Sequence, residues 1–329
     1  MTYSRITHAA VHLPTRRQSA AEIEQHLARR SPALRLPAGL LQRTFGLRER
    51  TVADPGDLPS DLAARAAVRL LSETRLEPAD VDLLLFAAVS ADVREPANAH
   101  IVAAKTGLSC PAFDVGNACN GVISALQVAD ALIRTGQHHR VLITCGETLS
   151  RVSRWELRRD QLRTGLTSLT GGDVGAALLL EASPVPGITD TVFWANSAGW
   201  PAATLYDPHH APDHPQGLHV DSDALMGSFV GLDAQATQWF KEQEVDLRSL
   251  DLVCIHQPSV PFAEAFCDRM GIDPFRIVPV FPHIGNAAAA TLPLQLTHAI
   301  GNGRLARGDS VCLFGTASGA SAGVTLLRW

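Results

Sequence analysis

Two apolar runs mark the hydrophobic pattern of this chain, VDLLLFAAVS at 81–90 and LDLVCIHQPS at 250–259, and each is typical of a buried strand. The two runs begin alike, and the likeness continues beyond them. Four identical pairs stand 169 positions apart: Asp82 and Asp251, Gly116 and Gly285, Asn117 and Asn286, Gly146 and Gly315. Because chance rarely keeps four matches in register, the chain is interpreted as one unit repeated once.

Between these anchors both halves follow the same order of elements. Short strands are expected at 113–115 and 278–281, each followed by a Gly-Asn turn, a helix of small residues and another strand. The helices, expected at 120–136 and 287–303, are apolar around most of their surface, which predicts burial between sheets. We expect two similar α/β halves related by a pseudo-twofold axis. Helical crossovers between short strands favour mostly parallel pairing.

Composition and charge exclude several classes of protein. The chain has 329 residues, of which 46% are apolar and 19% charged, with a formal net charge of −5. Such a charge creates no field for nucleic acid. No segment has the apolar length of a bilayer span or a signal peptide, so a cytoplasmic protein is expected. Six cysteines without metal-ligand spacing are expected to be reduced thiols, and no metal or other cofactor is expected.

Cys119 is the candidate nucleophile. It lies at the expected start of the first central helix, where unpaired N–H groups and the helix dipole lower the pKa of a thiol. The alternative is a small buried core thiol, and that interpretation is favoured for Cys145, Cys254 and Cys312, which lie inside apolar strands.

His256 and Asn286 are the candidate partners of Cys119. His256 follows a strand at its carboxyl end, where α/β sheets place their sites, and can move a proton or donate to an oxyanion. Asn286 occupies, in the second half, the turn that precedes Cys119 in the first. The pseudo-twofold axis is therefore expected to bring the three residues together, although each of the two partners could alone be a turn former.

The motifs around these residues resemble a known family, the β-ketoacyl-acyl-carrier-protein synthase III type of thiolase-superfamily condensing enzyme. The matching segments are FDVGNACNG (113–121), IHQPS (255–259), HIGNAAAA (283–290), RTFGLRER (43–50), GGDVGAALLL (171–180) and GDSVCLFGTASGASAGVTLLRW (308–329). The resemblance implies a five-layer αβαβα thiolase fold with an N-terminal half at 1–180 and a C-terminal half at 181–329. It also implies a homodimer, a Cys119-His256-Asn286 triad, acylation of Cys119, and an oxyanion hole formed by the backbone N–H groups of Cys119 and Ser318.

The loop DVREPANAH at 92–100 distinguishes branches of this family. Its Glu95 resembles the glutamate of olefin-biosynthesis thiolases and α-pyrone-forming ketosynthases, which implies a base that enters the partner subunit's site. Joining two acyl thioesters without decarboxylation requires removal of an α-proton, which a carboxylate of raised pKa can perform. The alternative is a solvated loop glutamate.

Substrate delivery is less clearly marked in the sequence. LPAGLLQ at 36–42 lacks the tryptophan with which many members of the family stack coenzyme A. Arg159 and Arg163, in an arginine-rich segment, could meet a phosphopantetheine phosphate or an acidic carrier protein, or form a solvated helix face. The histidines of YDPHHAPDHPQGLH (206–219) are expected in a lid loop rather than a metal site.

The leading hypothesis is a homodimeric ketosynthase that joins two acyl thioesters by Claisen condensation through acyl-Cys119, giving a β-keto product that can cyclise. Its partners are expected to be acyl carrier protein or acyl-coenzyme A. Three alternatives stay open: condensation with decarboxylated malonyl carrier protein, acyl transfer to an alcohol or amine, and a catalytically silent partner subunit.

Overall fold

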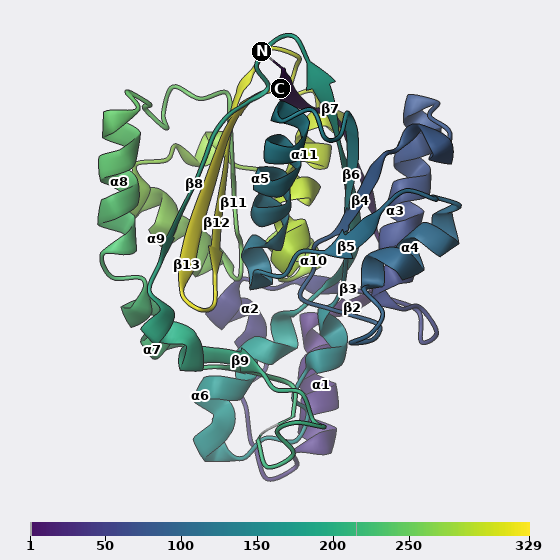
Figure 1. Ribbon diagram of the computed structural model, residues 1–329. Coiled ribbons are helices and arrows are strands. Elements are labelled where there is room, and N and C mark those ends of the chain that lie inside the picture. Colours follow the sequence, from purple (N-terminus) through teal and green to yellow (C-terminus); the bar gives the residue numbers. More distant parts are fainter. Residues whose placement is uncertain (1, 215) are drawn as a thin grey trace.

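Two β-sheets face each other across a pair of helices in the computed structural model, which describes residues 2–214 and 216–329 (Figure 1). The first, called the N-sheet, has the strand order β1 (Tyr3–His12), β7 (Asp173–Ser183), β6 (Arg140–Thr148), β4 (Leu83–Phe86), β5 (Ala112–Asp114). The second, called the C-sheet, has the order β11 (Leu252–Ile255), β12 (Ser310–Ala317), β13 (Ser321–Arg328), β8 (Ile188–Ala195).

Helices form three further layers. The helices α5 (Gly121–Arg134) and α11 (Thr291–Gly301) lie between the sheets, which confirms their predicted burial (Figure 1). The outer face of the N-sheet is covered by α3 (Pro59–Thr74) and α4 (Asn98–Thr106). The outer face of the C-sheet is covered by α8 (Leu232–Glu242) and α9 (Val260–Met270). The order of the layers is therefore αβαβα.

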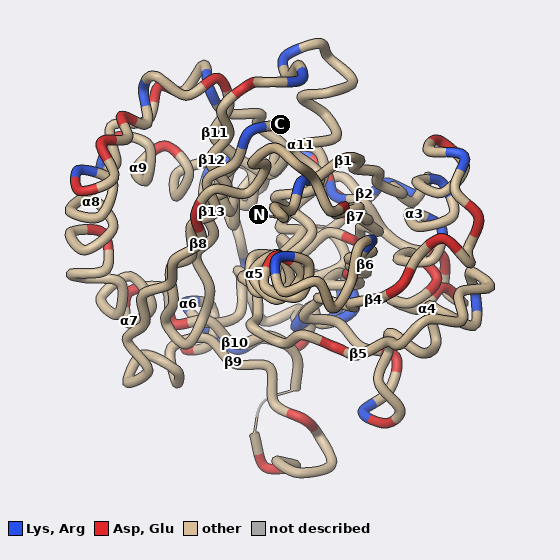
Figure 2. The backbone as a smooth tube through the Cα atoms, turned by 45° about the horizontal axis from the view of Figure 1, so that its top comes forward, with Lys and Arg blue, Asp and Glu red and all other residues tan. Residues whose placement is uncertain are grey.

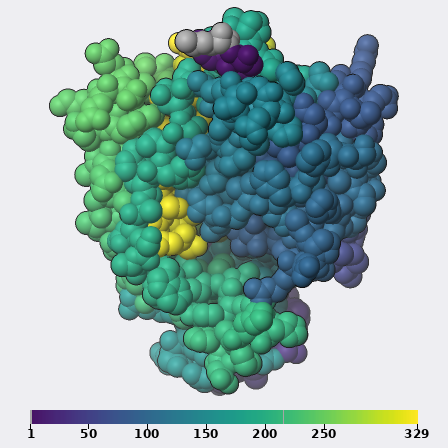
Figure 3. Space-filling model, in the orientation of Figure 1, coloured from purple at the N-terminus to yellow at the C-terminus, as the bar shows by residue number. Residues whose placement is uncertain are grey.

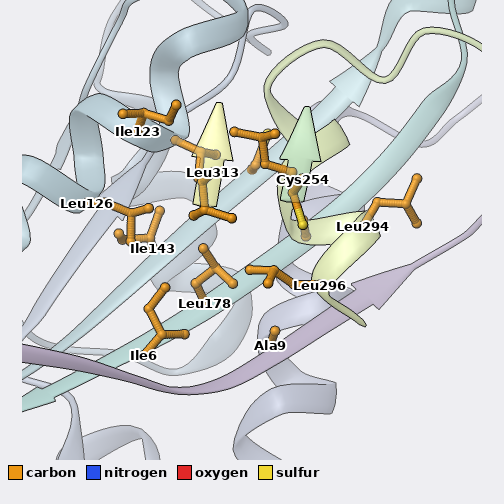
Figure 4. Packing of buried hydrophobic residues seen from close by; sticks show 14 of the residues in the cluster. Ile6, Ala9, Ile123, Leu126, Ile143, Leu178, Cys254, Leu294, Leu296 and Leu313 are labelled. Atoms are coloured by element: carbon orange, nitrogen blue, oxygen red, sulfur yellow. The ribbon is translucent and has the colours of Figure 1, made fainter. Parts of the chain in front are cut away.

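One apolar core fills the space between the sheets, and both halves of the chain contribute to it. The core includes Ile123 and Leu126 from α5, Leu294 and Leu296 from α11 and Leu313 of the C-sheet (Figure 4). Figure 3 shows the two halves in contact along the height of the molecule. Because the halves share this core, the division of the chain at residue 180 stays a prediction.

Most of the remaining helices and strands form a smaller region below the sheets in Figure 1, whereas the short helix α10 (Phe281–Ile284) lies between the sheets. The elements of the smaller region are β2 (Arg16–Ser19), α1 (Ala20–Arg30), α2 (Leu40–Phe45), β3 (Glu49–Val52), α6 (Leu162–Gly165), β9 (Ala203–Leu205), β10 (Leu218–Val220) and α7 (Ser222–Ser228). Figure 2 shows acidic and basic residues interspersed along the outer helices and loops. Among the described helices, none combines the length and the apolar character needed to cross a bilayer.

The prediction of mostly parallel strands is wrong. Parallel pairing joins β4 to β5, β4 to β6 and β11 to β12, whereas β1–β7, β6–β7, β12–β13 and β13–β8 are antiparallel. A parallel neighbour requires a crossover, which α4, α5 and α11 provide. The chain instead returns from β12 to β13 through a short turn, and it makes no helical crossover of the sheet between β6 and β7.

The strand predicted at 278–281 is also absent from the described structure, and α10 begins there at Phe281. The side chain of Gln257 takes the place of a neighbouring strand: its Nε2 donates to the Val278 carbonyl at 2.9 Å, and its Oε1 accepts from the Val280 N–H at 3.0 Å. Pro279 lacks an N–H group and could not complete a strand ladder.

Candidate active site

Cys119 lies in the 3-10 turn η2 (Ala118–Asn120), directly before α5, which confirms the predicted position at the start of a central helix. The side-chain Nδ2 of the buried Asn120 donates to the Ser321 hydroxyl at 2.9 Å and to the Ser321 carbonyl at 3.2 Å. Ala118 has a φ of 44°, a conformation that costs free energy for a residue with a Cβ. The turn that carries Cys119 is therefore held in place by the C-terminal half.

Asn286 lies just before the matching 3-10 turn η8 (Ala288–Ala290), which precedes α11 and packs against η2. Its N–H donates to the Thr170 carbonyl at 2.9 Å, and its carbonyl accepts from the Gly172 N–H at 2.9 Å. The side-chain Oδ1 accepts from the Ala288 N–H at 2.9 Å. Because that bond engages the oxygen, the Nδ2 hydrogens are the part of the Asn286 side chain that can donate to a further acceptor.

His256 follows β11 at its carboxyl end, and its backbone N–H donates to the Phe314 carbonyl of β12 at 3.0 Å. The strand β12 also packs against η2. The elements that carry Cys119, Asn286 and His256 therefore converge where the two halves meet. That these residues act as a catalytic triad stays a prediction.

The predicted lowering of the Cys119 pKa is wrong. Burial raises the pKa of the Cys119 thiol to about 12, and the Glu147 carboxylate adds to the rise. Burial also lowers the pKa of the His256 imidazole to about 4. No cation among the described residues acts on the thiol, and the partial charge at a helix start does not compensate for the loss of water. The site therefore rests as a neutral thiol and a neutral imidazole.

Glu147, at the end of β6, is a site residue that the sequence interpretation missed. Its side chain is fully buried, and burial raises the pKa of its carboxyl to about 7 against the lowering effect of hydrogen bonds from Val89 and Ser90. The available signal was an acidic residue within the otherwise apolar segment VLITCGET (141–148). A buried carboxyl of perturbed pKa indicates a functional position.

Ser318 lies in the turn that joins β12 to β13 and is partly exposed. The bonds from Asn120 to Ser321 tie the far end of this turn to η2. The oxyanion hole assigned to the N–H groups of Cys119 and Ser318 stays a prediction, with the two segments held close together.

Glu95 is exposed in the single chain, on the loop between β4 and α4. This loop lies next to β5, the edge strand of the N-sheet. Two apolar side chains of this region are also exposed, Val93 by 41% and Phe113 by 40%. The side chain of Glu95 is thus available to a second molecule.

The arginine-rich segment does not form the continuous helix face considered from the sequence. It consists of short pieces, namely η3 (Leu149–Val152), η4 (Arg159–Gln161) and α6. Arg163 makes ion pairs with Asp221, at 3.4 Å, and with Asp223. Arg159 is exposed.

The histidine-rich segment is a loop between β9 and β10, as predicted, with Pro215 outside the described residues. In it Tyr206 stacks on His214 with ring centroids 4.0 Å apart. Across residues 2–214 and 216–329, no group of three or more His, Cys, Asp or Glu side chains is arranged to hold a metal ion.

Comparison with known proteins agrees with this geometry. Residues 113–197 match the family 3-oxoacyl-acyl-carrier-protein (ACP) synthase III, and residues 240–329 match its C-terminal part. A β-ketoacyl-acyl-carrier-protein synthase III of Thiobacillus denitrificans is 31% identical over 333 residues, covering 100% of both chains.

Two solved structures of Xanthomonas campestris OleA have the same fold as this chain. The form with bound cerulenin gives a TM-score of 0.90 at 26% identity, covering 100% of this chain and 98% of that one. A cysteine-to-serine variant with bound lauric acid and lauroyl-CoA gives 0.90 at 25% identity, covering 99% of each chain. The expected five-layer fold is confirmed.

Proposed function

Because the chain belongs to the β-ketoacyl-acyl-carrier-protein synthase III family of condensing enzymes and has the thiolase fold, we propose that it joins two acyl thioesters by Claisen condensation through acyl-Cys119. The product is a β-keto thioester or acid, which can cyclise. The acyl groups arrive as thioesters of coenzyme A or phosphopantetheine, and the reaction uses no metal or redox cofactor. We place the enzyme in the cytoplasm, where such thioesters are made.

In the first step Cys119 attacks the carbonyl carbon of one acyl thioester. His256 accepts the thiol proton as the C–S bond forms and passes it to the departing thiolate, so that the proton balance closes. The low pKa of His256 suits a transient carrier, because the imidazolium gives up its proton at once. The N–H groups of Cys119 and Ser318 bind the oxyanion.

In the second step Glu95 of the partner subunit removes an α-proton from the second acyl thioester. The N–H of neutral His256 and the Nδ2 of Asn286 hold the enolate oxygen. The α-carbon then attacks acyl-Cys119, the thiolate leaves and a β-keto thioester results. The thiolate takes up one proton and protonated Glu95 releases one, so that both groups return to their starting forms. The observation that carries this proposal is the exposed Glu95 on a loop beside the sheet edge, because a decarboxylating malonyl donor would need no such base.

The homodimer belongs to the same proposal. An edge strand with exposed apolar neighbours, here β5 with Phe113 and Val93, is suited to pairing with a second copy. Pairing there would carry each Glu95 towards the other subunit. For substrate delivery we propose Arg159 and Arg163 as contacts for a thioester phosphate, with Arg163 released from Asp221 and Asp223 on binding.

Intact-protein mass spectrometry with a panel of acyl-coenzyme A thioesters tests the proposal. The enzyme should gain one acyl mass, Cys119→Ala should gain none, and Glu95→Gln should gain the acyl mass yet form no β-keto product. Condensation retained in Glu95→Gln contradicts the role of Glu95. A product that requires malonyl thioester indicates the decarboxylating reaction, and an ester or amide product indicates acyl transfer.

A further inference from the structure

Glu147 is a buried carboxyl that the condensation mechanism does not use. Its side chain has 0% exposure, and no Lys, Arg or His of the described residues forms an ion pair with it. In the other half of the fold Thr316 follows Gly315 as Glu147 follows Gly146. The fold therefore accommodates a neutral residue at this position. A buried carboxyl without a cation is costly, so its presence in the half that carries Cys119 requires another explanation.

The carboxyl of Glu147 binds the start of the loop that carries Glu95. Its Oε1 accepts from the Val89 N–H at 2.9 Å, and its Oε2 accepts from the Ser90 N–H at 3.1 Å. The Ser90 hydroxyl in turn accepts from the Thr148 N–H at 3.0 Å. Three hydrogen bonds thus fasten the loop to the end of β6.

Further bonds fasten the loop on both sides of Glu95. Asn98 accepts from the Asp92 N–H at 2.8 Å through Oδ1 and donates to the Val93 carbonyl at 3.2 Å through Nδ2. Asp92 accepts from the Ser60 N–H at 2.9 Å. Glu95 lies between Val93 and Asn98, and the bonds from Glu147 hold the stretch of the loop that leads to it. The side chain of Glu147 differs from the others that fix the loop because it is fully buried and belongs to the central strand β6.

The groups that face Glu147 are few. From β6 the Cys145 thiol lies 3.8 Å from Oε1, and from η2 the Cys119 thiol is close enough for the carboxylate to raise its pKa. The η8 turn contributes the backbone N–H of Ala289, and the loop contributes backbone N–H groups and the Ser90 hydroxyl. Within residues 2–214 and 216–329, the titratable side chains found beside this carboxyl are therefore the two thiols.

We propose that ionised Glu147 is a positioning residue, which holds the loop so that Glu95 reaches the partner's site in a reactive geometry. The inference rests on the proposed role of Glu95. A carboxylate accepts both N–H bonds as charge-assisted bonds, and protonation weakens them. Because burial raises the pKa of Glu147 to about 7, the ionised fraction and the condensation rate should rise together as the pH increases through 7.

Glu147→Gln tests this inference, because it keeps the shape but turns an NH2 group towards one of the two N–H donors. Condensation should fall about 100-fold, the cost of a small misplacement of a catalytic group. Acylation of Cys119 should not slow, because removal of the carboxylate lowers the pKa of the thiol. The limb of the pH-rate profile near pH 7 should disappear. The matched control is Glu244→Gln, at an exposed glutamate after α8.

Hydrogen exchange gives a readout that does not depend on condensation. Peptides covering 88–97 should exchange faster in Glu147→Gln, with α5 and β6 unchanged. In the unmodified enzyme, exchange of the Val89 and Ser90 amides, corrected for its intrinsic pH dependence, should lose protection below about pH 7. This pH dependence in the unmodified enzyme tests the role of Glu147 even if the variant does not fold. It also tests that role if the chain does not condense acyl groups. Unchanged exchange, or acylation lost together with condensation, would overturn the inference.

Discussion

Cys119 and His256 rest in their neutral forms because desolvation raises the pKa of the Cys119 thiol, which is only partly exposed, and lowers the pKa of the buried His256 imidazole. Cysteine enzymes that store a thiolate need a nearby cation or a polar helix start in contact with water. Here the nearest charge is the Glu147 carboxylate, which opposes thiolate formation. Reaction with a thioester therefore requires removal of the thiol proton, which the proposed mechanism assigns to His256.

The pH dependence of alkylation tests this resting state. With a thiol pKa near 12, the thiolate fraction rises about tenfold per pH unit, and so should the rate at which iodoacetamide labels Cys119 between pH 7 and 9. Mass spectrometry of the peptide that contains Cys119 measures this rate. The urea-unfolded chain is the control, since its rate should level off above the ordinary thiol pKa. A rate in the folded enzyme that is already constant at pH 7 would show a stored thiolate.

The positions of the site residues could be predicted from the sequence, and their protonation could not. Cys119 and Asn286 stand in turns that the internal repeat aligns, and His256 follows an apolar run with a recognisable strand pattern. Burial depth, which decides the pKa values, depends on how the two halves pack. Glu147 was missed for the same reason, because one acidic residue near a strand end reads as a surface position until the packing is known.

At the scale of elements, the hydrophobic pattern predicted the strands β4, β5, β6, β11 and β12 and both central helices. The errors came from long-range pairing. The strand expected at 278–281 is replaced by backbone bonds to Gln257, a side chain 21 residues before Val278. The antiparallel pairing of β7 with β6, and of β13 with β12, depends on the path that the chain takes after β6 and after β12. Hydrophobic pattern alone carries no information on that direction.

The contact between α3 and the N-sheet depends on a glycine. A Cβ added to Gly146 of β6 would lie 1.9 Å from the carbonyl oxygen of Pro59 at the start of α3. We expect Gly146→Ala to push α3 away from the sheet and to lower the free energy of unfolding by at least about 1 kcal/mol. Urea unfolding measures the change. Gly56→Ala, where a Cβ meets nothing within 4 Å, is the control, and equal midpoints for the two variants would contradict the close approach.

At the scale of the whole molecule, the five layers form a complete fold, but the residues of the proposed mechanism lie in two separate places. One chain contributes Cys119, His256 and Asn286 from elements that converge in its interior, while its Glu95 is exposed on a loop beside an edge strand. The layers were predicted through the family resemblance. The dimer stays a prediction, because the sequence of one chain and its structure describe only one side of such an interface.

Subunit complementation tests whether Glu95 acts across a dimer. Cys119→Ala and Glu95→Gln should each be inactive in condensation. When the two are co-refolded in equal amounts, half of the dimers should be mixed, and in each of these one site combines an intact Cys119 with an intact Glu95 from the other subunit. About a quarter of the unmodified condensation rate should return, measured as β-keto product. The control is Cys119→Ala mixed with the double variant that carries both Cys119→Ala and Glu95→Gln, and this mixture should stay inactive. If Glu95 served its own chain, neither subunit would carry a complete site, and no activity would return in either mixture.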